Sequence, residues 1–131
     1  MKFYISTKIN GDFDATIERV KSELSEEGFG VLSDIDVEST LKQKLGVDFR
    51  KYRILGACNP PFSHKALQAE DKIGTLLPCN VIVQETEPNS IEVAAVDPQV
   101  SMQGVSNGEI ESIAGEIKDR LQKVIDRLTS S

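Results

Sequence analysis

The C-terminal third of the chain carries an apolar stripe at helical spacing, and this stripe limits what the chain can fold into. Its members are Ile110, Ile113, Ala114, Ile117, Leu121, Val124, Ile125 and Leu128. Residues at these intervals share one face of an α-helix. Ser106 and Glu109 have the spacing of a capping box at its start. Such a helix must bury its stripe against another layer of secondary structure, so the rest of the chain has to supply that layer.

The segments that supply it alternate between apolar and polar residues, as β-strands with one buried face do. Strands are predicted at residues 2–9, 29–35, 52–58, 79–86 and 91–96. Between the first two, Phe13, Ile17, Val20 and Leu24 predict a second amphipathic helix that begins at Asp12 and ends at Gly28. Two short helices are expected as well. One is capped by Asp34 or Asp36, and the other begins at Asn59-Pro60-Pro61.

These elements predict an α+β fold in a single domain over residues 1–131. The order is strand, helix, four strands with short helical inserts, and a long helix. Alternating strands favour a mainly antiparallel sheet with one covered side, and the two main helices are the layer that covers it. The expected architecture is therefore a two-layer sandwich. Residues 97–107 are expected to be irregular.

Charge and apolar content exclude several classes of function. The chain has 15 Lys and Arg against 21 Asp and Glu, a net charge of −6, and such a surface repels phosphate backbones and anionic lipid. With five Phe, two Tyr and no Trp it also lacks a base-stacking platform. No apolar run is long enough for a membrane span, and the N-terminus has no signal-peptide block. We therefore expect a cytoplasmic protein that binds neither nucleic acid nor membrane.

The segment from Gly56 to His64 holds the densest group of chemically able side chains. Cys58 is expected at the end of a strand, just before a helix N-terminus whose dipole favours a thiolate. Asn59 can cap that helix or donate to an anion, and His64 follows about one turn later. Cys58 and His64 are therefore candidate catalytic residues, nucleophile and base. The alternative is structural: a core thiol, a cap and a surface histidine.

Two further residues are expected at the same edge of the sheet. If the third and fourth strands are antiparallel neighbours, the end of the strand with Cys58 meets the start of the strand with Cys79. The two thiols would then lie near enough for a reversible disulfide or a shared soft metal. Asp97, after the fifth strand, would return to this edge and could orient the histidine. The candidate ligand-binding set is thus Cys58, Asn59, His64, Cys79 and Asp97, and the candidate metal ligands are Cys58, Cys79 and His64. Two unrelated thiols and a turn aspartate are the alternative.

Three stretches resemble a known family. They are residues 29–36 (FGVLSDID), 52–60 (YRILGACNP) and 76–81 (LLPCNV), followed by Asp97-Pro98 before the long helix. Together they are similar to the bacterial and archaeal family of domain of unknown function 302. The resemblance covers nearly the whole chain and implies a strand–helix–four strands–helix fold of the TATA-binding-protein-like class. It implies no activity, because none is established for that family.

The sequence therefore predicts a binding domain with a Cys/His/Asn site for a small ligand, an anion or a soft metal. No cofactor is indicated. Two alternatives stay open: a thiol-dependent enzyme that uses Cys58, and an interaction or homodimerisation module in which the cysteines are structural.

Overall fold

The structure is a computed structural model that describes residues 2–129, and it confirms the mixed α+β sandwich. All neighbouring strands of its five-stranded sheet run antiparallel, in the order β1-β5-β4-β3-β2. The strands are β1 (Tyr4–Asn10), β2 (Gly30–Asp36), β3 (Tyr52–Cys58), β4 (Cys79–Glu87) and β5 (Ser90–Val96). Strands β3, β4 and β5 form the centre of the sheet, and β1 and β2 are its edges.

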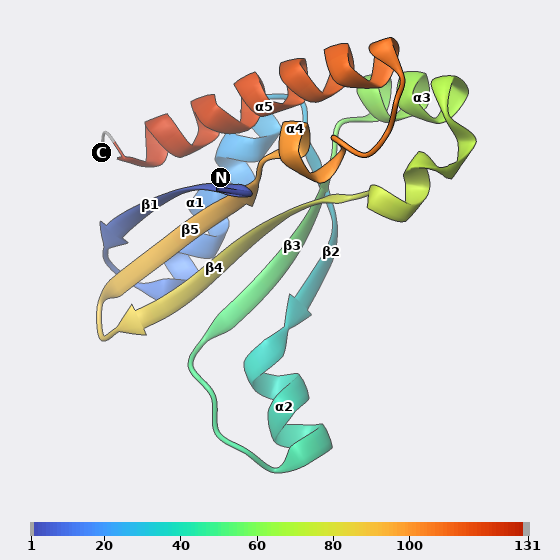
Figure 1. Cartoon of the computed structure of the whole chain (residues 1–131). Coiled ribbons are helices and arrows are strands. Elements are labelled where there is room, and N and C mark those ends of the chain that lie inside the picture. The colour runs from blue at the N-terminus through green and yellow to red at the C-terminus, as the bar shows by residue number, and fades with distance from the viewer. Residues whose placement is uncertain (1, 130–131) are drawn as a thin grey trace.

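Two helices cover one face of this sheet, as the sequence predicted. They are α1 (Phe13–Glu26) and α5 (Gly108–Thr129) (Figure 1). Helix α3 (Pro60–Ala69), the 3₁₀ helix η1 (Asp71–Leu76) and the short helix α4 (Pro98–Ser101) gather near one end of the sheet. Helix α2 (Val37–Leu45) projects beyond the opposite end. Within residues 2–129, no helix combines the length and the apolar character needed to cross a membrane.

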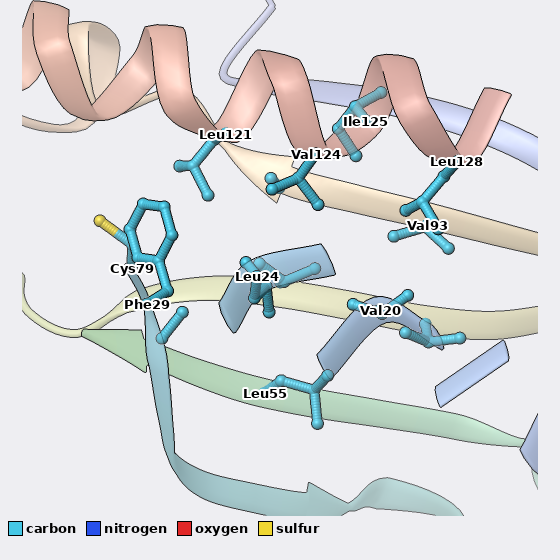
Figure 2. Packing of buried hydrophobic residues seen from close by; sticks show 14 of the residues in the cluster. Val20, Leu24, Phe29, Leu55, Cys79, Val93, Leu121, Val124, Ile125 and Leu128 are labelled. Atoms are coloured by element: carbon cyan, nitrogen blue, oxygen red, sulfur yellow. The ribbon is translucent and has the colours of Figure 1, made fainter. Parts of the chain in front are cut away.

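The core lies between the sheet and the two long helices, where the apolar stripes meet. Leu121 and Leu128 of α5 and Leu24 of α1 are fully buried against Val93 and Leu55 of the sheet (Figure 2). A smaller cluster of Ala66, Ile73, Met102, Ile110 and Ala114 joins α3, η1 and α4 to the start of α5. The stripe of α5 therefore serves both cores along its length.

Local capping explains where most helices begin, and it corrects two expectations. Asp12 caps α1 through Ala15, and Asp36, of the two candidates, caps α2 through Ser39. Helix α5 is capped by Asn107, whose Oδ1 accepts from the backbone N–H groups of Glu109 and Ile110 at 2.9 and 3.3 Å. The expected Ser106–Glu109 capping box is therefore wrong. Residues 97–107 are also not wholly irregular, because α4 lies within them.

Candidate functional site

Cys58 ends β3 as predicted, but the helix that follows offers it few donors. Its side chain is half-buried, and its Sγ lies 3.1 Å from the Oγ of Ser63. Helix α3 begins with Pro60 and Pro61, neither of which has a backbone N–H. Two of the donors that normally stabilise an anion at a helix start are therefore missing. Cys58 therefore has the hydroxyl of Ser63 as a polar contact, and the helix start that follows it has fewer N–H donors than usual.

Asn59 and His64 lie in different environments, one buried and the other exposed. Asn59 is buried, and its side chain does not cap α3. Its Nδ2 donates instead to the carbonyl of Glu27 at 3.2 Å, an oxygen that also accepts from Arg120 of α5 at 3.1 Å. Asn59 thus ties the end of α1 to the end of β3. His64 lies exposed on α3.

Cys79 is buried in the core and lies on the other side of the sheet from Cys58. It pairs with Ala57, the residue before Cys58, and is 4% exposed. Successive residues of a strand point to opposite faces, so the two thiols do not face each other. Burial, with a smaller contribution from the nearby Cys58, raises the pKa of Cys79 to about 11. Both cysteines are free thiols.

Asp97 does return to the same end of the sheet, but its carboxylate is already occupied. It is buried, its Oδ1 accepts from the backbone N–H of Gln99 at the start of α4, and its Oδ2 lies 2.9 Å from the Nζ of Lys118. Within residues 2–129, no group of three or more His, Cys, Asp or Glu side chains could hold a metal ion. A soft metal would thus depend on the two thiols, one of which is deeply buried and holds its proton.

An apolar hollow lies elsewhere, on the sheet face that α1 and α5 leave uncovered. Val81, Val83 and Val93 point into the core. Because side chains alternate along a strand, their neighbours in β4 and β5, such as Ile82 and Ala94, point to the uncovered face. They form the floor of a hollow of about 380 Å³. Its lining consists of Phe3, Tyr4, Tyr52, Asn80, Ile82, Gln84, Glu92, Ala94, Ala95 and Val96. We call this the open-face hollow.

Aromatic side chains line the open-face hollow at both β1 and β3. On the β1 side the rings of Phe3 and Tyr4 meet edge to face, with centroids 5.1 Å apart. On the β3 side the rings of Phe49 and Tyr52 are tilted, with centroids 6.2 Å apart. Phe3 is 64% exposed, an unusual position for so large an apolar side chain. Phe3, Tyr4 and Tyr52 therefore line the hollow, and Phe49 packs on Tyr52 without being part of the lining.

A line of polar groups crosses one end of the open-face hollow. The Nε of Arg50 donates to the Oε1 of Gln84 at 2.7 Å, and the Nε2 of Gln84 donates to the Oε1 of Glu92 at 2.8 Å. Arg50 also stacks on the rings of Phe49 and Tyr52, with its guanidinium carbon 4.3 and 5.8 Å from their centroids. A ligand with an apolar body and a polar head group would match this arrangement.

Sequence reasoning did not find the open-face hollow, although the chain carries a signal for it. In a sheet with one solvated face, outward residues should be polar. Val81-Ile82-Val83 and Val93-Ala94-Ala95-Val96 are instead apolar at successive positions. Such runs show that both faces of β4 and β5 are apolar, although helices cover only one of them.

Comparisons with known proteins identify relatives but no activity. The sequence matches the model of "Domain of unknown function DUF302" over residues 5–128. No curated protein matches it. The crystal structure of an uncharacterised conserved protein DUF302 from Bacillus stearothermophilus is similar, with 29% sequence identity and a TM-score of 0.89. The similarity covers 98% of this chain and 99% of that one.

Proposed function

Because the chain belongs to the DUF302 family, whose function is unknown, we propose a role from its own geometry: it is a cytoplasmic domain that binds a small amphipathic molecule in the open-face hollow. The volume of the hollow carries the proposal. Its ~380 Å³ lies within the range of about 300–1,000 Å³ that small-molecule pockets occupy. The cytoplasmic location is proposed because both cysteines are free thiols, as cysteines usually are in a reducing compartment.

The lining supports an amphipathic ligand over a purely apolar one. Ile82, Ala94 and Val96 offer an apolar floor, while Asn80 and Gln84 bring carboxamide groups to the same surface. Ligand sites are typically apolar with a few polar groups that orient the ligand. The apolar floor supplies binding free energy, and the carboxamides select the polar head.

A thiol-dependent enzyme is the weaker alternative. Cys58 has Ser63 as its polar neighbour, and within residues 2–129 no hydrogen bond joins it to His64, the one histidine of the chain. A cysteine nucleophile needs a base within hydrogen-bond reach or a strong anion-stabilising field. The first is absent from this geometry, and the two prolines of α3 reduce the second.

The chain carries its own reporter for the proposed site. Its two tyrosines, Tyr4 and Tyr52, both line the open-face hollow, and it has no tryptophan. The neutral probe N-phenylnaphthylamine should therefore quench tyrosine fluorescence and gain emission itself as it binds. We expect a saturable titration with one site per chain.

A filling substitution tests where the probe binds. Ala94→Leu should abolish the titration, because the larger side chain occupies the floor of the hollow. The matched control is Ala15→Leu, the same change at an exposed position of α1. Equal binding by the wild type and Ala94→Leu, with both variants folded by circular dichroism, would refute the proposed site.

A further inference from the structure

We propose that the ligand of the open-face hollow carries an anionic group, and that Arg50 recognises it. This inference rests on the proposed function and deepens it. The observation behind it is a guanidinium held rigidly at one end of the hollow, beside two of its lining residues, Tyr52 and Gln84.

Arg50 is preorganised although it is exposed. Its guanidinium carbon lies 4.3 Å from the Phe49 ring centroid and 5.8 Å from that of Tyr52, so the side chain stacks on two rings. Its Nε is bonded to Gln84. An arginine held in this way loses little conformational entropy when it binds a ligand.

The unused donors of Arg50 suit an anion. Within residues 2–129 its two Nη groups take part in no hydrogen bond, and the guanidinium is in no ion pair. Paired N–H groups in one plane match the oxygens of a carboxylate, sulfonate or phosphate. The amide of Gln84 holds the guanidinium by Nε and leaves the outer edge available.

Glu92 is the one carboxylate in the lining, and it does not make the site prefer a cationic ligand. Glu92 accepts from Gln84, and it lies directly opposite Lys8 of β1 in the sheet register. Lys8 and Glu92 point to the same face, so the lysine offsets the charge of Glu92. Within residues 2–129, no salt bridge pairs Arg50 with a carboxylate, and Glu92 is linked to it only through Gln84.

The occupant is a single molecule and not a membrane surface. A net charge of −6 repels an anionic bilayer, whereas one small anion meets mainly the local field of Arg50. The size of the hollow also suits one molecule of moderate size.

Two probes that differ by one sulfonate separate this inference from the proposed function. N-phenylnaphthylamine is neutral, and anilinonaphthalene sulfonate has the same ring system with an added anion. We expect the sulfonate to bind about tenfold more tightly to the wild type, which is the factor that a charge-assisted hydrogen bond supplies. Arg50→Gln should remove that advantage and leave the neutral probe's affinity within about twofold.

The matched control is Lys51→Gln, which removes the same charge from the next residue. The ammonium of Lys51 lies over the Phe13 ring, 5.9 Å from its centroid and on the α1 side of the sheet. It should leave both probes' affinities unchanged, whereas Arg50→Lys should keep part of the preference because it retains charge but loses the planar fork.

Each outcome has a distinct meaning. If neither probe binds, the proposed function fails. If both bind equally, or if Lys51→Gln weakens the sulfonate as much as Arg50→Gln does, the hollow binds ligands but Arg50 does not select an anion. The protein should not cosediment with phosphatidylglycerol vesicles. Cosedimentation that depends on Arg50 would overturn the inference that the ligand is a single small molecule and not a membrane surface.

Discussion

At the scale of single residues, the two cysteines should differ sharply in reactivity. Cys58 is half-buried, whereas Cys79 is 4% exposed and its pKa is raised to about 11 by burial. A thiol reacts as the thiolate and only where the reagent can reach it. We expect Cys58 to be alkylated by iodoacetamide in the folded protein, and Cys79 only after unfolding. Rates measured on Cys58→Ala and Cys79→Ala check this, and an inert Cys58 would contradict it.

The same burial predicts that Cys79 lowers stability at alkaline pH. Folded Cys79 keeps its proton up to about pH 11, whereas an unprotected thiol loses it near 9.0. Between these values unfolding releases a proton, so the free energy of unfolding falls as pH rises, by at most ~1.4 kcal/mol per pH unit. Urea titrations across this range should show a shallower fall for Cys79→Ala than for the wild type. Cys58→Ala serves as the control and should keep most of the fall, because burial is the larger cause of the raised pKa of Cys79.

Gly56 of β3 is required by its neighbours on the uncovered face. A Cβ at this position would lie 2.9 Å from the Cγ of Pro78 and would overlap the Oγ of Ser33. Gly56→Ala should therefore destabilise the fold by about 1–3 kcal/mol through overpacking. Gly30→Ala on the adjacent strand meets nothing within 4 Å and is the matched control. Chemical denaturation of both variants decides the matter, and equal losses would show that Gly56 is not crowded.

At the scale of elements, the cap of α5 differs between sequence and structure: the sequence predicted Ser106, and the structure uses Asn107. Asn107 accepts from two backbone N–H groups of α5 and donates to the carbonyl of Ala69 at 3.2 Å. Asn107→Ala should cost about 0.5–2 kcal/mol, the usual value of an N-cap. Ser106→Ala should be nearly neutral. Thermal unfolding of the two variants distinguishes the caps, and a greater loss for Ser106→Ala would restore the capping box.

The elements with agreeing local signals were predictable. In α1 the cap at Asp12, the apolar stripe and the end near Gly28 all indicate the same helix. The start of α5 was not predictable, because Ser106 and Asn107 are both good caps. The choice between them depends on Ala69, a residue distant in the chain. The partner of Asn59 is distant as well: its amide binds Glu27 across the fold. Sequence spacing carries no information about such contacts.

The candidate site was predictable only in its position along the sheet. Cys58, Cys79 and Asp97 do come to one end, as antiparallel pairing of β3, β4 and β5 required. The direction of the side chains was not predictable from the sequence. Cys79 points into the core because its partner is Ala57 and not Cys58, and a shift of one residue in register would reverse this. Register depends on packing across the whole sheet.

At the scale of the whole molecule, the sheet has two different faces. One face is covered by α1 and α5 and holds the core, and the other carries the open-face hollow. Two layers are enough to bury the stripes of both helices, so the fold does not need the second face for its stability. That face is therefore available for binding.

Helix α2 shows how unevenly stability is distributed over the molecule. None of its residues is buried, and Leu45 and Val47 at its end are 69% and 44% exposed. Its order comes from its caps, Asp36 at the start and Gly46, with a φ of +68°, at the end. Isolated helices this short are marginal in water. Helix α2 (Val37–Leu45) should therefore open locally while the rest of the chain remains folded.

Native-state hydrogen exchange tests this expectation. Amides of α2 should exchange with much less protection than those of β4 and α5, which should open only in global unfolding. Helix α1, which is of the same type but buries Val20 and Leu24, is the internal control and should be protected. Strong protection of α2 would show that a surface absent from the isolated chain covers Leu45 and Val47. Protection that rises with protein concentration would identify that surface as a second copy and would support the homodimer.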